Sequence, residues 1–176
     1  MIGTFPLSPS DSSIAMIKAH SDSRFAFLRR HNTCQALFYG LITLYAFIAL
    51  VTLNHYGIHG DEPGHVRYGQ DILRWYQSLF QDQSVFQSRN TWLYGGAFDA
   101  PTALIARIVP LNIYTIRHFC NILIGLLGIV TTYRLDNRLN GPTTGLLAAL
   151  FLVLTPRYYV SSFSNTKDIP FAVGYL

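Results

Sequence analysis

Two neighbouring carboxylates in the stretch "GIHGDEPGHV", residues 57–66, are the first candidates for chemistry in this sequence. Asp61 and Glu62 stand a few residues after an uncharged apolar run, and Glu62 is the single glutamate of the chain. Carboxylates beside apolar surface are costly, and those that persist are candidates for function by default. The pair therefore marks a candidate site where the chain leaves the apolar run.

Two other interpretations of this stretch stay open. Asp61 followed by Pro63 fits the start of a helix, with Asp61 as the capping residue and the proline in the first turn. His59 and His65 suggest a metal site, but the H-E-x-x-H pattern of zinc proteases is absent, because aspartate precedes Glu62 where that pattern requires histidine. We therefore favour a helix cap or a functional acid at this position over a zinc site built from histidines.

A second acidic residue stands in "NTKDIPFA", residues 165–172. Asp168 also fits a helix cap, with Pro170 in the first turn, and Lys167 beside it could pair with an anion. If the chain brings Asp168 to the same side as Asp61, the two could share one site, with their carboxyl groups within about 10 Å.

The third candidate is Arg117, followed by His118, about one turn inside a second apolar run. An arginine at the edge of a membrane span can extend to the lipid phosphates. It can also clamp a phosphate in a site, because the guanidinium matches phosphate oxygens in a bidentate manner and keeps its charge. The second interpretation predicts that Arg117 faces the same cavity as the acids.

Apolar runs predict the helices that must position these residues. Residues 35–54 carry no charge, and twenty helical residues rise about 30 Å, enough to cross the hydrocarbon core. The run is too long for the apolar part of a cleaved signal peptide. Further spans are predicted at 113–133 and 143–160, and a fourth starts at 169–176. The fold class we expect is an all-α integral membrane protein with a polytopic helical bundle.

Lysine and arginine near the span ends predict the orientation. Basic residues in the tail 1–34 and in the turn 134–142 place both in the cytoplasm. The loops 55–112 and 161–168 are then external. We expect the protein in the bacterial inner (plasma) membrane, with a cytoplasmic N-terminus.

The long external loop is predicted to carry amphipathic helices on the membrane surface. After Pro63, apolar residues recur at helical spacing, with Trp75, Tyr76 and Phe80 on the apolar face. Such a helix lies flat at the interface of a membrane. A second apolar patch at 102–112 is too short to span and is interrupted by a proline.

Composition supports the membrane class. Charged residues make up 12% of the chain and hydrophobic residues 50%, with a mean hydropathy of +0.25, whereas soluble domains carry about 25% charged residues. The net charge is +4, but the arginines flank apolar runs and form no patch, so we expect no nucleic-acid partner. Cys34 and Cys120 fall at different depths of antiparallel helices, which predicts two free thiols.

The order of these motifs resembles a known family. The first span followed by "GIHGDEPGH", and the stretch from "NIYTIRHFCNILIG" to "SNTKDIPFA", resemble the protein O-mannosyltransferase and aminoarabinose-transferase type of enzyme. These are glycosyltransferases of the family 39 type with the GT-C fold, and they use a polyprenyl-phosphate sugar. The resemblance covers residues 35–176, the N-terminal part of such enzymes. Because these enzymes have around ten or more spans, we expect this part alone to be inactive.

The resemblance implies a role for each candidate residue. Asp61 matches the catalytic base and Glu62 its companion, and Arg117 matches a ligand of the donor phosphate. Asp168 matches a second acidic residue near the site, where a divalent metal could bind; the sequence leaves the metal open. Lys167 would assist at the phosphate.

The function implied is transfer of a sugar from a polyprenyl-phosphate donor to an acceptor hydroxyl, on a protein, a glycan or a lipid, at the external face. Two alternatives remain: a transporter or channel segment, in which acids and an arginine serve ions or protons, and a non-catalytic membrane scaffold subunit. A channel predicts charges in the middle of spans, whereas every acid here lies outside the apolar cores.

Overall fold

The computed structural model describes residues 11–87 and 91–176, with side chains described from residue 29 onward, so residues 1–10 of the predicted tail lie outside it. The described residues form helices and no strand, which confirms the all-helical prediction. The elements are α1 (Asp11–Thr52), η1 (Leu53–His55), α2 (Glu62–Gln77), η2 (Gln83–Gln87), η3 (Thr91–Tyr94), α3 (Asp99–Ile108), α4 (Ile113–Asn140), α5 (Pro142–Leu154), α6 (Pro156–Ser164) and α7 (Asp168–Gly174).

Two helical segments are long and apolar enough to cross a membrane, Arg29–His55 and Ile113–Asn140. They contain the first two predicted spans. Helix α1 does not begin near residue 35, because the chain from Asp11 onward holds neither proline nor glycine that would stop a helix before Gly40. Helix α4 likewise continues beyond residue 133 to Asn140.

The predicted third span, 143–160, is a bent pair of helices. Helix α5 ends at Leu154 and α6 begins at Pro156, with an angle of 65° between them. The residue between them, Thr155, has extended backbone angles (φ −75°, ψ 109°), as expected for a residue that precedes proline. The apolar pattern continues through Val160, and Pro156 within it marks the position of the bend.

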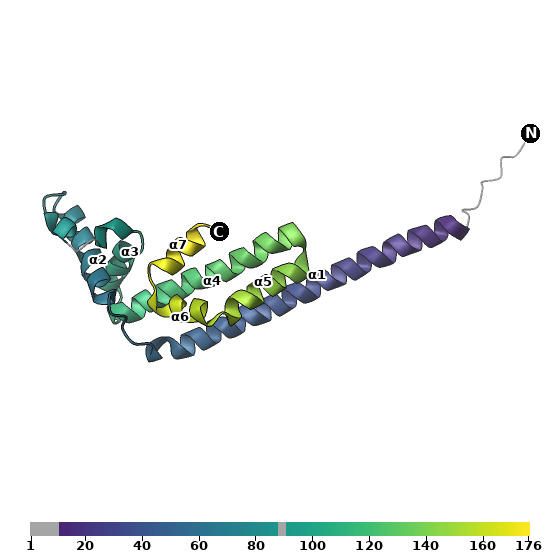
Figure 1. Ribbon diagram of the computed structural model, residues 1–176, viewed down its shortest axis with the longest axis horizontal. Helices are drawn as coiled ribbons and strands as arrows, with labels where there is room; N and C mark the ends of the chain where they lie inside the picture. Colours follow the sequence, from purple (N-terminus) through teal and green to yellow (C-terminus); the bar gives the residue numbers. More distant parts are fainter. Residues whose placement is uncertain (1–10, 88–90) are drawn as a thin grey trace, which may run out of the picture.

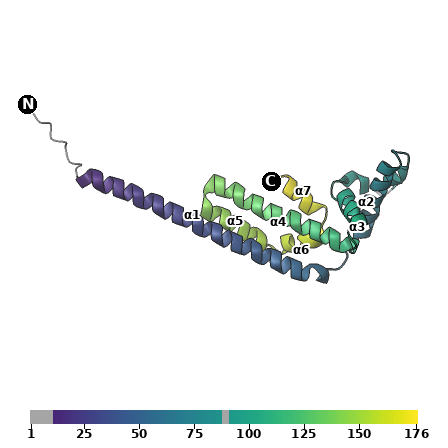
Figure 2. The same ribbon diagram turned by 180° about the vertical axis from the view of Figure 1, so that it is seen from behind.

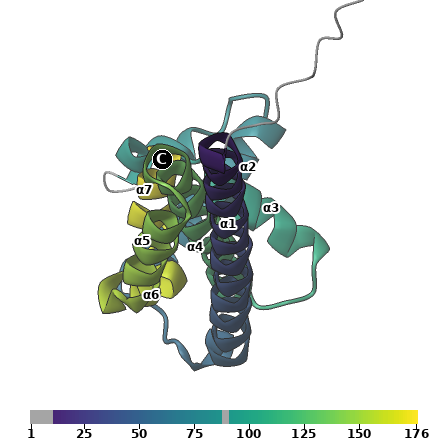
Figure 3. The same ribbon diagram turned by 90° about the vertical axis from the view of Figure 1, so that its right-hand side faces the viewer.

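The long helices lie side by side. Helices α4 and α5 pack along part of α1, whose N-terminal half extends beyond them (Figure 1). Viewed from behind, α4 runs antiparallel to α1 (Figure 2). Cys34 and Cys120, which lie on these two helices, are free thiols, as predicted. Along the molecule, α5, α6 and α7 lie on one side of α1 and α3 on the other (Figure 3). Gly141, with φ +96°, makes the turn from α4 to α5.

Aromatic stacking and small residues hold this bundle together. The Phe38 ring of α1 stacks on the Tyr133 ring of α4 with centroids 3.8 Å apart. On α4, Gly125 lets α6 approach, since a Cβ there would lie 2.7 Å from Ser162 Oγ. The Tyr158 hydroxyl donates to the Gly125 carbonyl at 2.6 Å. Close backbone approach at small residues is the usual way helices associate in membranes.

Helices α2 and α3 form a cap across one end of the bundle (Figure 1). The predicted amphipathic helix and the short apolar patch are therefore both helical, and α3 ends at Ile108, before Pro110. Phe80 was wrongly placed on the first of them: α2 ends at Gln77, and Leu79 and Phe80 have positive φ angles of 52° and 71°. Their side chains are exposed.

Candidate functional site

The N-terminal ends of α2, α3 and α4 meet around one buried arginine. Arg117, near the start of α4, is 0% exposed. Its Nη1 donates to Asp99 Oδ1 at 2.8 Å and its Nη2 donates to Thr166 Oγ1 at 2.9 Å. Its Nε lies 3.6 Å from Glu62 Oε1. Arg117 thus connects the starts of three helices with the segment that precedes α7.

Two histidines complete this buried cluster. His65 Nδ1 lies 2.9 Å from Asp99 Oδ2, and His118 Nε2 lies 3.2 Å from Glu62 Oε1. One arginine faces two carboxylates, and each carboxylate also contacts one histidine. Buried charges persist in folded proteins when they are paired and hydrogen-bonded. We name Glu62, His65, Asp99, Arg117 and His118 the buried charge cluster.

The structure corrects two expectations for Arg117. Its guanidinium does not extend to lipid phosphates, because it is enclosed by protein. It is also not an open phosphate clamp, since Asp99 and Thr166 already accept from its terminal nitrogens. Glu62, expected beside a catalytic base, is 1% exposed and belongs to the same cluster. Both residues therefore hold the end of the bundle together.

Asp61 is accessible, whereas the neighbouring Glu62 is buried. Asp61 occupies the capping position of α2, but its side chain makes no capping hydrogen bond, so the capping interpretation is wrong for the carboxylate. The carboxylate accepts from Lys167 Nζ and lies 2.8 Å from His59 Nδ1, and the side chain is 45% exposed. Partial burial raises the pKa of Asp61, but hydrogen bonds from Lys167 and His59 outweigh this effect and lower the pKa to about 2.

Lys167 lies between two acids. The hydrogen bond to Asp61 is the main cause that raises the pKa of Lys167, and the charge of Asp168 adds to it. The Lys167 ammonium also lies 4.9 Å from the centroid of the Tyr94 ring, a cation–π distance. Both predicted acids, Asp61 and Asp168, therefore act on the same cation.

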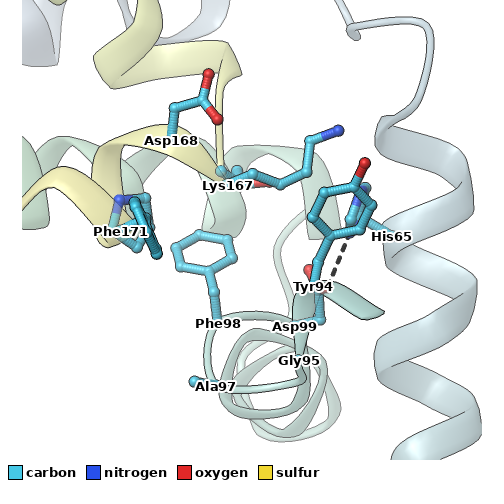
Figure 4. A pocket seen from close by; sticks show the side chains of 11 residues that line it. His65, Tyr94, Gly95, Ala97, Phe98, Asp99, Lys167, Asp168 and Phe171 are labelled. Atoms are coloured by element: carbon cyan, nitrogen blue, oxygen red, sulfur yellow. Dashed lines mark hydrogen bonds and ion pairs between the residues drawn. The ribbon is translucent and has the colours of Figure 1, made fainter. Parts of the chain in front are cut away.

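Asp168 is not a helix cap either. It is the first residue of α7, and its carboxylate accepts from Asn165 Nδ2 at 2.7 Å. Its side chain is exposed and points away from the cluster in Figure 4, on the same segment as Lys167.

A cavity of about 430 Å³ opens beside Lys167, a volume in the range of small-molecule sites. The side chains of Tyr94, Phe98 and Phe171 form aromatic walls, and Lys167 lies along one edge (Figure 4). His65, Asp99 and Thr166 line the cavity and contact each other or Arg117, so the buried charge cluster forms part of its wall.

Sequence reasoning missed Asp99, which pairs with both Arg117 and His65. The available signal was its place just before an apolar helical patch, with Pro101 two residues later as in a first helical turn. Trp75 lines a separate hollow of about 470 Å³ together with Tyr68 and Phe86.

Two further observations bear on identity. Within residues 29–87 and 91–176, no three histidine, cysteine, aspartate or glutamate side chains are grouped to hold a metal ion. Comparison of the chain with protein-family models, with curated proteins and with solved structures found no match, so the arguments for a function come from the residues and their geometry.

Proposed function

We propose that this chain belongs to a membrane glycosyltransferase that moves a sugar from a polyprenyl-phosphate donor to an acceptor hydroxyl at the external face of the bacterial plasma membrane. One observation carries the proposal. Asp61 is an accessible, ionised carboxylate, and it contacts the lysine that lines an aromatic cavity at one end of an apolar bundle. Transfer of a sugar from a lipid phosphate needs a base, a cation and a cavity at the end of apolar helices. The family resemblance of residues 35–176 supports the same reaction.

In this reaction the acceptor oxygen forms a bond to the anomeric carbon while the bond from that carbon to the phosphate oxygen breaks. The bonding electrons leave with the phosphate, and Asp61 takes the acceptor proton. A placed general base contributes about 10²–10⁴-fold. Lys167 would stabilise the charge that builds on the departing phosphate.

The buried charge cluster has a positioning role in this proposal. Arg117 donates to Thr166, the residue before Lys167, and so fixes the segment that carries the cation. Glu62 pairs with Arg117 and His118, so the neighbouring Asp61 is attached to a fixed point. Arg117, first expected as a phosphate ligand, is therefore proposed to act through Thr166.

The location of the site agrees with a lipid-linked donor. The cavity lies at the end of the bundle that α2 and α3 cover, opposite the C-terminal end of α4, which carries Arg134 and Arg138 (Figure 1). By the charge rule, we propose that this end of α4 is cytoplasmic. The cavity then faces outward at the surface, where the headgroup of a polyprenyl phosphate lies.

Asp61→Asn in the full-length protein tests the proposal. The amide keeps the shape but cannot take a proton, so we expect the rate of sugar transfer to fall about 10²–10⁴-fold. The assay follows transfer from a polyprenyl-phosphate sugar in nanodiscs, normalised to folded protein. Asp82→Asn, at an acid of the same loop that makes no contact with Lys167, is the control and should keep the parental rate.

Two results would count against the proposal in different ways. If Asp61→Asn keeps more than about half of the rate, Asp61 is not the base. If the parent transfers no sugar from any polyprenyl-phosphate donor to protein, glycan or lipid, the enzyme proposal fails, and the transporter and scaffold alternatives remain.

A further inference from the structure

Lys167 is positioned between a carboxylate and an empty space. Of the described residues that line the cavity, it is the one lysine or arginine. Asp61 accepts from its ammonium but does not line the cavity. The ammonium can therefore be approached by a second anion from the cavity without prior removal of Asp61.

The cavity suits a phosphate ester better than a fully polar anion. Tyr94, Phe98 and Phe171 provide apolar surface for an organic group, and Lys167 is at the edge of that surface (Figure 4). The guanidinium of Arg117 cannot compete for the anion, because it is enclosed by its own partners. The lining also includes two carboxylates: Asp99 is paired with Arg117 and His65, and Asp168 accepts from Asn165. Lys167, held by Asp61, is the cation that an entering anion meets.

We propose that the cavity binds a phosphate ester whose anion takes Lys167 from Asp61, so that the binding of the phosphate frees the carboxylate. A phosphate brings more negative charge and more acceptor oxygens than a carboxylate, and charge-assisted hydrogen bonds to it are strong. Lysine is a compact charge on a flexible stem, so it can turn from one anion to the other. The Tyr94 ring holds the ammonium near both.

This exchange rests on the proposed function only in naming the ester as the lipid-linked donor. It adds a form of regulation to that site. While Lys167 is bound to Asp61, the carboxylate is a weak base; once the phosphate holds Lys167, Asp61 loses its nearest opposite charge and its pKa rises towards the ordinary value. Proton uptake would then be favoured only when a donor is present.

Binding measurements on the full-length protein in nanodiscs test the exchange without any transfer reaction. The probes are a short isoprenyl phosphate, the isoprenol of the same length and inorganic phosphate. We expect Lys167→Gln to weaken binding of isoprenyl phosphate about tenfold or more, as for loss of a hydrogen bond to a charged group. Lys167→Arg keeps the cation and should keep most of the binding.

The direction of the change in binding affinity in Asp61→Asn is the decisive result. The substitution removes the internal competitor, so isoprenyl phosphate should bind about two- to fivefold tighter, the range for loss of an exposed ion pair. Arg107→Gln, at an exposed arginine of α3 outside the cavity lining, is the matched control and should change neither value. If the Asp61–Lys167 pair only braces the fold, Asp61→Asn will instead leave binding unchanged or weaken it, which overturns the proposal.

The probes also distinguish the source of the phosphate. Tighter binding of isoprenyl phosphate than of inorganic phosphate supports a lipid-linked ester, while equal binding of the two keeps the exchange but assigns it to free phosphate. Isoprenol that binds as well as its phosphate refutes the exchange. Exchange without sugar transfer refutes only the proposed enzyme, and transfer without exchange refutes only this inference.

Discussion

Arg117 is a cation in a place where cations are rare, fully enclosed near the start of an apolar helix. The free-energy cost of removing its charge from water is offset by Asp99 and Glu62, which lie within ion-pair distance. Because the partners come from α2 and α3, the charge pairs also determine how the cap sits on the bundle. A buried pair is weak evidence for stability, but breaking one leaves an uncompensated charge.

Arg117→Gln should therefore destabilise the protein strongly. The variant leaves Asp99 and Glu62 buried without their cation, and loss of one partner in a buried pair costs about 3–5 kcal/mol. The measurement is thermal unfolding in detergent. Arg107→Gln, at an exposed position, is the control, and its change should stay within about 0.5 kcal/mol. Equal unfolding temperatures for the two variants would contradict the role given to the cluster.

The Asp61–Lys167 pair should contribute to stability over a defined range of pH. The folded pKa of Asp61 is about 2, below the ordinary 3.8. The contribution is therefore complete above about pH 3.8 and is lost as the pH falls through about 2. The difference in unfolding temperature between the parent and Asp61→Asn should be constant from pH 5 to 7 and vanish below pH 2, as followed by thermal unfolding. A difference that grows towards low pH would contradict the pair.

At this scale the sequence identified the right residue types but not their surroundings. Asp61 and Glu62 are neighbours, yet one is accessible and the other buried, because successive residues at a helix start point in different directions. Composition and spacing cannot tell which of two adjacent acids faces inward. Asp99 was missed because a single acid before a short apolar patch has no motif around it.

At the scale of elements, periodicity and apolar length predicted most helices, while their ends depended on contacts. The two long helices and both helices of the cap follow from local pattern. The end of α2 at Gln77 and the bend before Pro156 do not follow from local pattern, although the sequence contains this proline. A proline can sit in the first turn of a new helix or kink an existing one, and only packing decides.

The contact between α2 and α3 depends on one glycine. A Cβ on Gly69 would collide with the Asp99 carbonyl and come within 3.2 Å of the Ala103 Cβ. Gly69→Ala should therefore push α3 away, move Asp99 from Arg117, and destabilise the protein by about 1–3 kcal/mol in thermal unfolding. Gly64→Ala on the same helix meets nothing within 4 Å and is the matched control. Equal stability of the two variants would mean that α3 can shift freely.

At the scale of the whole molecule, the cap and the basic C-terminal end of α4 lie at opposite ends of the bundle (Figure 2). The charge rule predicts that this end of α4 is cytoplasmic and that the cap is external. Every role argued for Asp61 and Lys167 at an external face depends on this orientation.

Cysteine labelling in intact cells checks the orientation. With Cys34 and Cys120 replaced by alanine, an impermeant maleimide should modify Gln87→Cys in intact cells, since Gln87 is exposed on the cap. Asn140→Cys, exposed at the end of α4, should react only after the cells are permeabilised. The reverse pattern would place the cavity in the cytoplasm.

The order of residues in the buried charge cluster has a consequence for how the chain is made. Glu62 and Asp99 precede Arg117, and Thr166 follows it. Since a ribosome delivers a chain from its N-terminus, both counter-charges exist before the cation leaves the ribosome. The chain therefore already contains both acidic partners of Arg117 when α4 is synthesised, and translation of Thr166 adds the last partner. A permuted gene in which the segment coding for α4 came first would deliver the arginine before either acid.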